Sequence, residues 1–170
     1  MSQQARHPAK VLTVSDSVEA GNREDVSGAA LVARLTEAGY EVIERRVVSD
    51  DVEEISNALS YMSYGFNGLI VTTGGAGFGQ RDFTPEATKR ILDRSAPGMA
   101  EAMRTVSPRG LLSRAVAGTR GSSLILNLAA APDRAVQMLD AVLDAVPEVI
   151  GLLGGGFVPT VDAVEPNLTD

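Results

Sequence analysis

The chain has no cysteine and no tryptophan, and its single histidine is His7. Without cysteine it can form no disulfide, and it offers no thiolate to a metal or a substrate. Because His7 lies in a polar segment before the first predicted strand, His-based catalytic triads and most zinc sites are excluded. Any metal is therefore expected to be a hard ion held by oxygen atoms, and magnesium is the natural candidate.

Aromatic residues make up only 4% of the 170 residues, and the formal net charge is −7. Nucleic-acid binding uses cationic surface and aromatic stacking platforms, so a nucleic-acid partner is disfavoured. No apolar run approaches the length that crosses a bilayer, and the polar residues 1–10 do not resemble a signal peptide. We therefore expect a cytoplasmic protein without a membrane partner.

Short apolar, β-branched runs alternate along the chain with amphipathic helical patterns. Strands are predicted at 10–14, 41–48 (nearer a sheet edge), 68–71 and 122–128, and helices at 27–38, 52–64, 85–93, 99–106 and 132–146. Residues 111–118 are compatible with a strand or the end of a helix, and residues 18–25 are predicted to form a loop. This alternation predicts a three-layer α/β/α, Rossmann-like fold with a mainly parallel sheet. We expect a flexible leader at 1–9, one domain at 10–153 and an acidic tail at 154–170.

Residues 72–87 contain four glycines within six positions, Gly74, Gly75, Gly77 and Gly79, between a predicted buried strand and a predicted helix start. Glycines let backbone amides approach an anion without side chains in the way. Arg81 and Asp82 follow, and then Thr84 and Pro85 are typical of a helix N-cap and first turn. The segment predicts a phosphate-handling site. Its spacing fits neither the Walker A nor the dinucleotide-binding pattern, so a purely structural turn is the alternative.

Three aspartates, Asp16, Asp50 and Asp82, each follow a predicted strand. The carboxyl ends of parallel strands meet at one edge of the sheet, where such folds bind ligands. Asp50 also stands three residues before Glu53, which is the spacing of a capping box, so a helix cap is its structural alternative. For Glu101 and Arg104, three residues apart on a predicted helix, the alternative to a ligand role is a surface ion pair.

With these residues assembled, positions from about 10 to 153 resemble the molybdopterin-binding MogA/MoaB family of molybdenum-cofactor biosynthesis. The most specific motif is Thr-Thr-Gly-Gly-Ala-Gly at 72–77 with Arg-Asp-Phe-Thr-Pro-Glu-Ala at 81–87. Supporting motifs are Val-Ser-Asp at 14–16, Ser-Asp-Asp at 49–51, Pro-Gly-Met-Ala-Glu-Ala-Met-Arg at 97–104, Leu-Ser-Arg-Ala at 112–115 and Asn-Leu at 127–128.

The resemblance implies binding of molybdopterin and its adenylylation by Mg-ATP, with release of pyrophosphate. It implies catalytic and metal-binding roles for Asp50 and Asp82. The residues expected to contact molybdopterin or the nucleotide are Ser15, Asp16, Thr73, Gly74, Gly75, Ala76, Gly77, Glu101 and Ser113. It also implies a homotrimer or hexamer. Phosphoryl and nucleotidyl transfer depend on positioning and charge neutralisation, so the lack of a cysteine or histidine nucleophile is no obstacle.

The chain departs from the family pattern at two places. After Asn127 and Leu128 the family usually has Pro-Gly-Ser-Pro or Pro-Gly-Asn-Pro, whereas residues 129–132 are Ala-Ala-Ala-Pro. This change removes a hydrogen-bonding side chain near the phosphate end of the pterin, and Ala76 replaces a usual threonine. A second hypothesis is therefore a catalytically weakened binding module that acts through a protein partner. A third is another nucleotide-using enzyme on the same scaffold.

Overall fold

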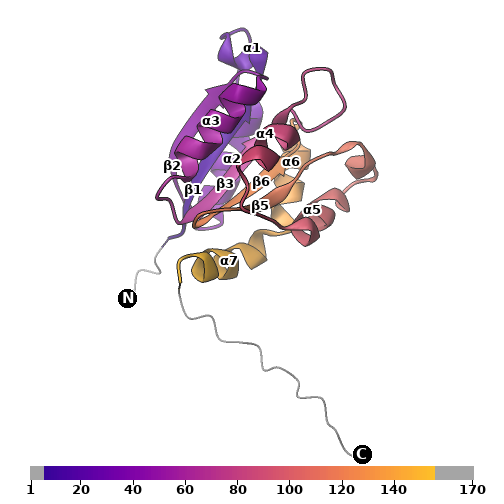
Figure 1. Cartoon of the computed structure of the whole chain (residues 1–170). Helices are drawn as coiled ribbons and strands as arrows, with labels where there is room; N and C mark the ends of the chain where they lie inside the picture. The colour runs from indigo at the N-terminus through magenta and orange to yellow at the C-terminus, as the bar shows by residue number, and fades with distance from the viewer. Residues whose placement is uncertain (1–5, 156–170) are drawn as a thin grey trace, which may run out of the picture.

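The computed structural model describes residues 6–155, which form one mixed sheet (Figure 1). The strands are β1 (Pro8–Val14), β2 (Glu41–Val48), β3 (Gly68–Thr73), β4 (Arg94–Ser95), β5 (Ala117–Arg120) and β6 (Ser123–Leu128). Their order is β2-β1-β3-β6-β5-β4. The first four strands in this order are parallel to one another, and β5 pairs antiparallel with both β6 and β4. The predicted mainly parallel sheet is confirmed, with β2 at its edge.

Helices cover both faces of this sheet. They are α1 (Asp16–Glu19), α2 (Val26–Glu37), α3 (Val52–Ser63), α4 (Thr84–Ile91), α5 (Pro97–Arg104), α6 (Pro132–Asp140) and α7 (Val146–Leu153), with 3-10 turns η1 (Pro108–Leu112) and η2 (Leu143–Ala145). In Figure 1, α3 and α4 lie over one face, and α2 and α6 lie behind it. The three-layer α/β/α arrangement is confirmed.

The core consists of two apolar clusters, one on each face of the sheet. Alternating residues of a strand serve opposite clusters, as in β3, where Leu69 and Val71 pack on the α2 and α6 side and Ile70 packs against α3 and α4. Every residue of β3 and of β6 is buried. This two-sided burial explains the uninterrupted apolar runs at 69–71 and 124–126 within these strands.

The parallel strands all end at one edge of the sheet. β1 and β3 are neighbours in the sheet. After β1 the chain continues to β2 on one side of this pair, and after β3 it continues to β4, β5 and β6 on the other side. The loops that follow β1 and β3 therefore diverge, which is the arrangement that opens a ligand crevice in doubly wound sheets.

Several predicted boundaries are wrong. The helix expected at 132–146 ends at Asp140, and α7 begins separately at Val146. The apolar stripe runs on because Val142, Leu143 and Val146 pack into the same cluster as α6. Run 111–118 contains part of η1, a loop and the start of β5, and the loop expected at 18–25 is preceded by α1, which includes two of its residues.

At the N-terminus β1 begins at Pro8, two residues inside the expected leader. Residues 1–5, and all of the expected tail except Gly154 and Gly155, lie outside the described residues.

Candidate active site

The loops at the carboxyl edge of the sheet enclose two adjacent cavities. The first, the aspartate cavity, has a volume of about 510 Å³ and is lined by Ser15, Asp50, Thr73, Gly74, Gly75 and Asp82, among others. The second, the arginine cavity, has a volume of about 320 Å³, and its lining includes Gly75, Ala76, Gly77, Asp82, Ser113, Arg104, Arg109 and Arg134. Gly75, Asp82 and Ala130 line both cavities.

The glycine loop, residues 74–82, needs glycine for its first turn. Gly74 has φ +98° and Gly75 has φ +67°. A Cβ on Gly74 would lie 2.3 Å from the carbonyl oxygen of Val14. The amides of Gly75, Ala76 and Gly77 have no hydrogen-bond partner within residues 6–155, so they are available to an anion in the cavities that they line.

The hydroxyl of Thr84 holds this loop from the helix side. It donates to the carbonyl oxygen of Gly74 at 2.9 Å, and the Thr84 amide donates to Gly75 O at 3.0 Å. The predicted capping role of Thr84 is therefore wrong, because α4 begins at Thr84 itself and has no side-chain cap. The hydroxyl is used to fix the glycine turn.

Arg114 ties the middle of the glycine loop to its end. Its guanidinium donates to Gly77 O at 2.5 Å and to Asp82 O at 2.7 Å, and it pairs with the Glu86 carboxylate. The hydrogen bond from Arg114 lowers the pKa of Glu86. In the sequence Arg114 stood out only as part of a motif, since a single arginine 37 residues after Gly77 carries no local signal of this contact.

Asp82 closes the loop through one carboxylate oxygen. Its Oδ2 accepts from the Gly79 amide at 2.8 Å, and the Asp82 amide donates to Gly79 O at 3.1 Å. The other oxygen, Oδ1, has no hydrogen-bond partner in the described part of the chain. Asp82 therefore presents a carboxylate oxygen where the two cavities meet.

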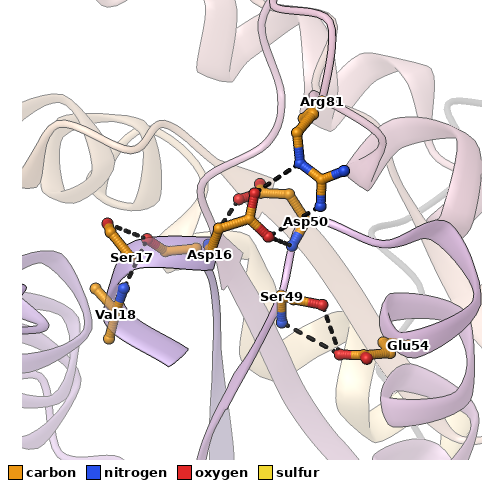
Figure 2. Close-up of polar contacts among 8 residues, drawn as sticks. Asp16, Ser17, Val18, Ser49, Asp50, Glu54 and Arg81 are labelled. Atoms are coloured by element: carbon orange, nitrogen blue, oxygen red, sulfur yellow. Dashed lines mark hydrogen bonds and ion pairs between the residues drawn. The ribbon is translucent and has the colours of Figure 1, made fainter. Parts of the chain in front are cut away.

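Asp16 and Asp50 exchange hydrogen bonds between their loops (Figure 2). The Asp16 amide donates to Asp50 Oδ2 at 2.8 Å, and the Asp50 amide donates to Asp16 Oδ1 at 2.9 Å. The predicted capping box at Asp50 is wrong by one residue. Asp51 is the N-cap of α3, and its Oδ1 accepts from the amides of Glu53 and Glu54 at 3.0 Å each.

Arg81 reaches this pair from the end of the glycine loop, as Figure 2 shows. Its Nε lies 2.6 Å from Asp16 Oδ2, and its Nη2 lies 3.0 Å from Asp16 Oδ1. The hydrogen bond from Arg81, followed by that from the Asp50 amide, lowers the pKa of Asp16. Burial, together with the charges of Asp16 and Asp82, raises the pKa of Asp50. A cation beside Asp50 and Asp82 would relieve that repulsion.

Most of the predicted site residues line one of the two cavities, and two do not. Ser15 and Thr73 line the aspartate cavity, and Ser113 lines the arginine cavity. Asp16 lies beside Asp50 but lines neither cavity, and Glu101 is exposed on α5 and also lines neither. Within residues 6–155 there is no Glu101–Arg104 ion pair.

Arg104 instead donates through Nη1 to the carbonyl oxygen of Ala115 at 2.8 Å. This bond leaves Arg104 on the wall of the arginine cavity.

Asp25 is a cleft residue that sequence reasoning missed. It lines the aspartate cavity, caps α2 by accepting from the Gly28 amide at 2.9 Å, and accepts from the Thr13 hydroxyl at 2.9 Å. Arg45 pairs with it at 2.9 Å. Because its carboxylate is fully engaged by these partners, Asp25 supports the wall of the cavity. An aspartate just before a predicted helix was the available signal.

The described residues contain no group of three or more His, Asp or Glu side chains that could hold a metal ion alone. Mg²⁺ usually keeps several waters and is bound by one or two carboxylates together with substrate phosphates. Asp50 and Asp82, which line one cavity and each have an uncommitted oxygen, fit that donor set. No helix between residues 6 and 155 is long and apolar enough to cross a membrane.

Known proteins resemble this chain in sequence and in fold. The protein-family model described as "Probable molybdopterin binding domain" matches residues 10–148. The molybdopterin adenylyltransferase of Helicobacter pylori strain J99 is 38% identical over 155 residues, covering 87% of this chain and 88% of that protein. The enzyme of the same name from Escherichia coli K12 is 34% identical, covering 91% and 89%.

Among solved structures, the molybdopterin biosynthesis enzyme MoaB from Thermus thermophilus superposes with a TM-score of 0.82 at 41% identity. The match covers 88% of this chain and 97% of that one. A MogA structure gives a TM-score of 0.80 at 30% identity, covering 86% and 99%. The chain therefore belongs to the molybdopterin-binding MogA/MoaB family of molybdenum-cofactor biosynthesis.

Proposed function

We propose that this protein adenylylates molybdopterin with Mg-ATP and releases pyrophosphate. The observation that carries the proposal is that Asp50 and Asp82 line one cavity together with the glycine loop. Relatives named molybdopterin adenylyltransferase at 34–38% identity support the same activity.

In the reaction, a terminal phosphate oxygen of molybdopterin attacks the α-phosphorus of ATP. A new bond forms between that oxygen and the α-phosphorus, the bond from the α-phosphorus to the oxygen that bridges it to the β-phosphorus breaks, and pyrophosphate leaves with that electron pair. Mg²⁺, when bound, would offset charge on the phosphates being transferred.

The chain's own residues position the reactants. Asp50 and Asp82 supply the carboxylate oxygens that would hold the ion, and the unpaired amides of Gly75, Ala76 and Gly77 would bind phosphate oxygens. The protein need not supply a nucleophile, which agrees with the residue types present.

The two cavities suit a reaction of two substrates. They share Gly75, Asp82 and Ala130, so molecules in each can meet at Asp82. Acidic residues and Ser15 line one cavity, which suits Mg-ATP. Arginines and the apolar side chains of Met103, Leu112 and Met138 line the other, which suits a phosphorylated pterin.

The test is pyrophosphate release from ATP, Mg²⁺ and molybdopterin. Asp82→Ala should lower the rate at least about a hundredfold, because it removes a carboxylate that acts on the transferred group. Asp133→Ala is a matched control, because that exposed carboxylate lines neither cavity.

Other results would point to the other hypotheses. Wild-type protein that binds molybdopterin but releases no pyrophosphate would be a binding module. In that case a stable protein partner, captured equally by the Asp50→Ala/Asp82→Ala double variant, would be expected. A thermal shift with a nucleotide other than ATP would instead favour a different nucleotide-using enzyme.

The proposal includes a cytoplasmic location and a homotrimer or hexamer, with no nucleic-acid partner. The net charge of −7 supports the last point. Light scattering coupled to size-exclusion chromatography would measure the assembly directly.

A further inference from the structure

The arginine cavity is basic, although the protein as a whole carries a net charge of −7. Arg104, Arg109 and Arg134 line it, and within the described residues Asp82 is the one acidic side chain on its wall. A concave site with three guanidinium groups and one carboxylate attracts an anion, because low-dielectric walls strengthen the field of its charges.

Two of these arginines are uncommitted. Within residues 6–155 the guanidinium groups of Arg109 and Arg134 make no ion pair and no hydrogen bond, whereas Arg81 pairs with Asp16 and Arg114 pairs with Glu86. Arg134 is also only partly exposed. A guanidinium with no protein partner, on a partly buried residue in the wall of a cavity, is available to bind an anionic ligand.

Arg134 lies close in sequence to the point where the two cavities meet. It lies in the first turn of α6, four residues after Ala130, which lines both cavities. Residues 129–131 are all alanine, and α6 has no side-chain cap. On this wall, therefore, Arg134 carries side-chain hydrogen-bond donors, which the three alanine side chains lack.

We infer that Arg134 binds the terminal phosphate of the pterin substrate, with Arg109 adding to the attraction of that anion. The inference rests on the proposed function, and it deepens it by naming the residues that select a phosphorylated pterin. The planar guanidinium can donate two parallel hydrogen bonds to a phosphate, which a lysine ammonium matches only in charge. The apolar side chains of Met103, Leu112 and Met138 then pack against the pterin ring.

The first measurement is steady-state pyrophosphate release as molybdopterin is varied. Arg134→Ala should raise the KM for molybdopterin about 10- to 100-fold and leave the KM for ATP unchanged. Arg134→Lys should recover part of the loss, and Arg109→Ala should give a smaller rise. Arg94→Ala is the matched control, because it removes the same charge from an exposed side chain that lines neither cavity.

The second measurement is equilibrium binding of molybdopterin and of its phosphatase-treated form, without ATP. Arg134→Ala should weaken binding of the phosphorylated form and leave that of the dephosphorylated form unchanged. Arg134→Gln, which keeps a polar side chain of similar length, should behave in the same way. Arg134→Gln replaces Arg134→Ala in this measurement if the alanine variant fails to fold.

The outcomes separate the two claims. Wild-type protein that neither binds molybdopterin nor releases pyrophosphate would refute the proposed function. Active wild-type protein, with Arg134→Ala matching Arg94→Ala, would overturn this inference alone. An equal loss for both forms of the pterin, or a loss of ATP affinity instead, would also overturn it.

Discussion

The backbone amide of Asp50 donates to the carboxylate of Asp16, and the amide of Asp16 donates to the carboxylate of Asp50, at 2.9 and 2.8 Å. These two bonds join the loop after β1 to the loop after β2 across the carboxyl edge of the sheet. Arg81 adds the end of the glycine loop to the same assembly. The orientation of Asp50 therefore depends on residues that do not line its cavity.

Asp16→Ala should reduce activity more than Arg81→Ala. Loss of the Asp16 carboxylate leaves the Asp50 amide without its acceptor, so the Asp50 loop is held less firmly. We expect about a tenfold fall in pyrophosphate release and a higher half-saturating Mg²⁺ concentration. The Arg81–Asp16 ion pair is exposed, so Arg81→Ala should cost about twofold. A larger effect of Arg81→Ala would show that the ion pair, and not the amide bonds, positions Asp50.

Asp50→Asn should stabilise the folded protein at neutral pH while it abolishes activity. Burial raises the pKa of Asp50 above its usual 3.8, so the folded state disfavours the charged form. Folding is therefore penalised above the folded-state pKa, and the penalty disappears below 3.8, where the carboxyl is protonated in both states. In metal-free buffer at pH 7.5 we expect the unfolding temperature to rise by about 1–3 °C.

This gain from Asp50→Asn should shrink steadily as the pH is lowered. The measurement is a thermal melt of both proteins between pH 3.5 and 8. Equal unfolding temperatures at pH 7.5, or a gain that grows toward acid pH, would contradict the assignment.

Arg114→Lys should loosen the glycine loop. A lysine can reach one of the two carbonyl oxygens that Arg114 contacts, but it cannot bridge Gly77, Asp82 and Glu86 together. We expect the free energy of unfolding to fall by about 1–2 kcal/mol, measured by urea denaturation.

Arg90→Lys is the matched control for that variant. Arg90 pairs with the exposed carboxylate of Glu53, so its replacement should change stability by less than about 0.5 kcal/mol. Similar losses for Arg114→Lys and Arg90→Lys would refute the bridging role.

Gly74→Ala should be costly for two separate reasons. Its φ of +98° is strained for any residue with a side chain, and the new Cβ would meet the Val14 carbonyl oxygen at 2.3 Å. Gly39 has a similar φ of +88° with nothing within 4 Å of a built Cβ, so Gly39→Ala measures the backbone strain alone. We expect Gly39→Ala to cost about 1 kcal/mol.

Gly74→Ala should therefore cost clearly more than Gly39→Ala, and it should lower the rate of pyrophosphate release as the loop shifts. Chemical denaturation of both variants checks the comparison. Equal losses of unfolding free energy in the two variants would show that the close contact between Gly74 and the Val14 carbonyl oxygen adds no cost.

The strands and the glycine turn could be predicted because their signals are local. Buried runs such as 68–71 and the cluster of glycines after them depend on neighbouring residues alone. The cap of α3 could not be assigned, since Asp50 and Asp51 offer the same carboxylate one residue apart. The choice between them is made by the Asp16 amide, which lies 34 residues earlier in the chain.

The arginines of the site show the same limit. Arg134 looks like an ordinary surface residue in the sequence, and Arg114 belongs to a motif that gives no sign of its contacts. Only the folded chain brings Arg114 to the glycine loop and Arg134 to a cavity wall. Two-residue β4 was missed because both of its residues are exposed, so no apolar pattern marks it. Asp16, Asp50 and Asp82 could be predicted to lie together. The alternation of strands with helices predicts a parallel sheet, and the carboxyl ends of its strands meet at one edge.

The lining that the two cavities share has a consequence for the end of the catalytic cycle. Under the proposed reaction, the adenylylated pterin is one molecule that fills both cavities at once and keeps the contacts of each half. Such a molecule binds more tightly than either half alone, since its second half is already in place when the first is bound. Because tighter binding slows dissociation, we expect this product to leave the cleft more slowly than pyrophosphate does.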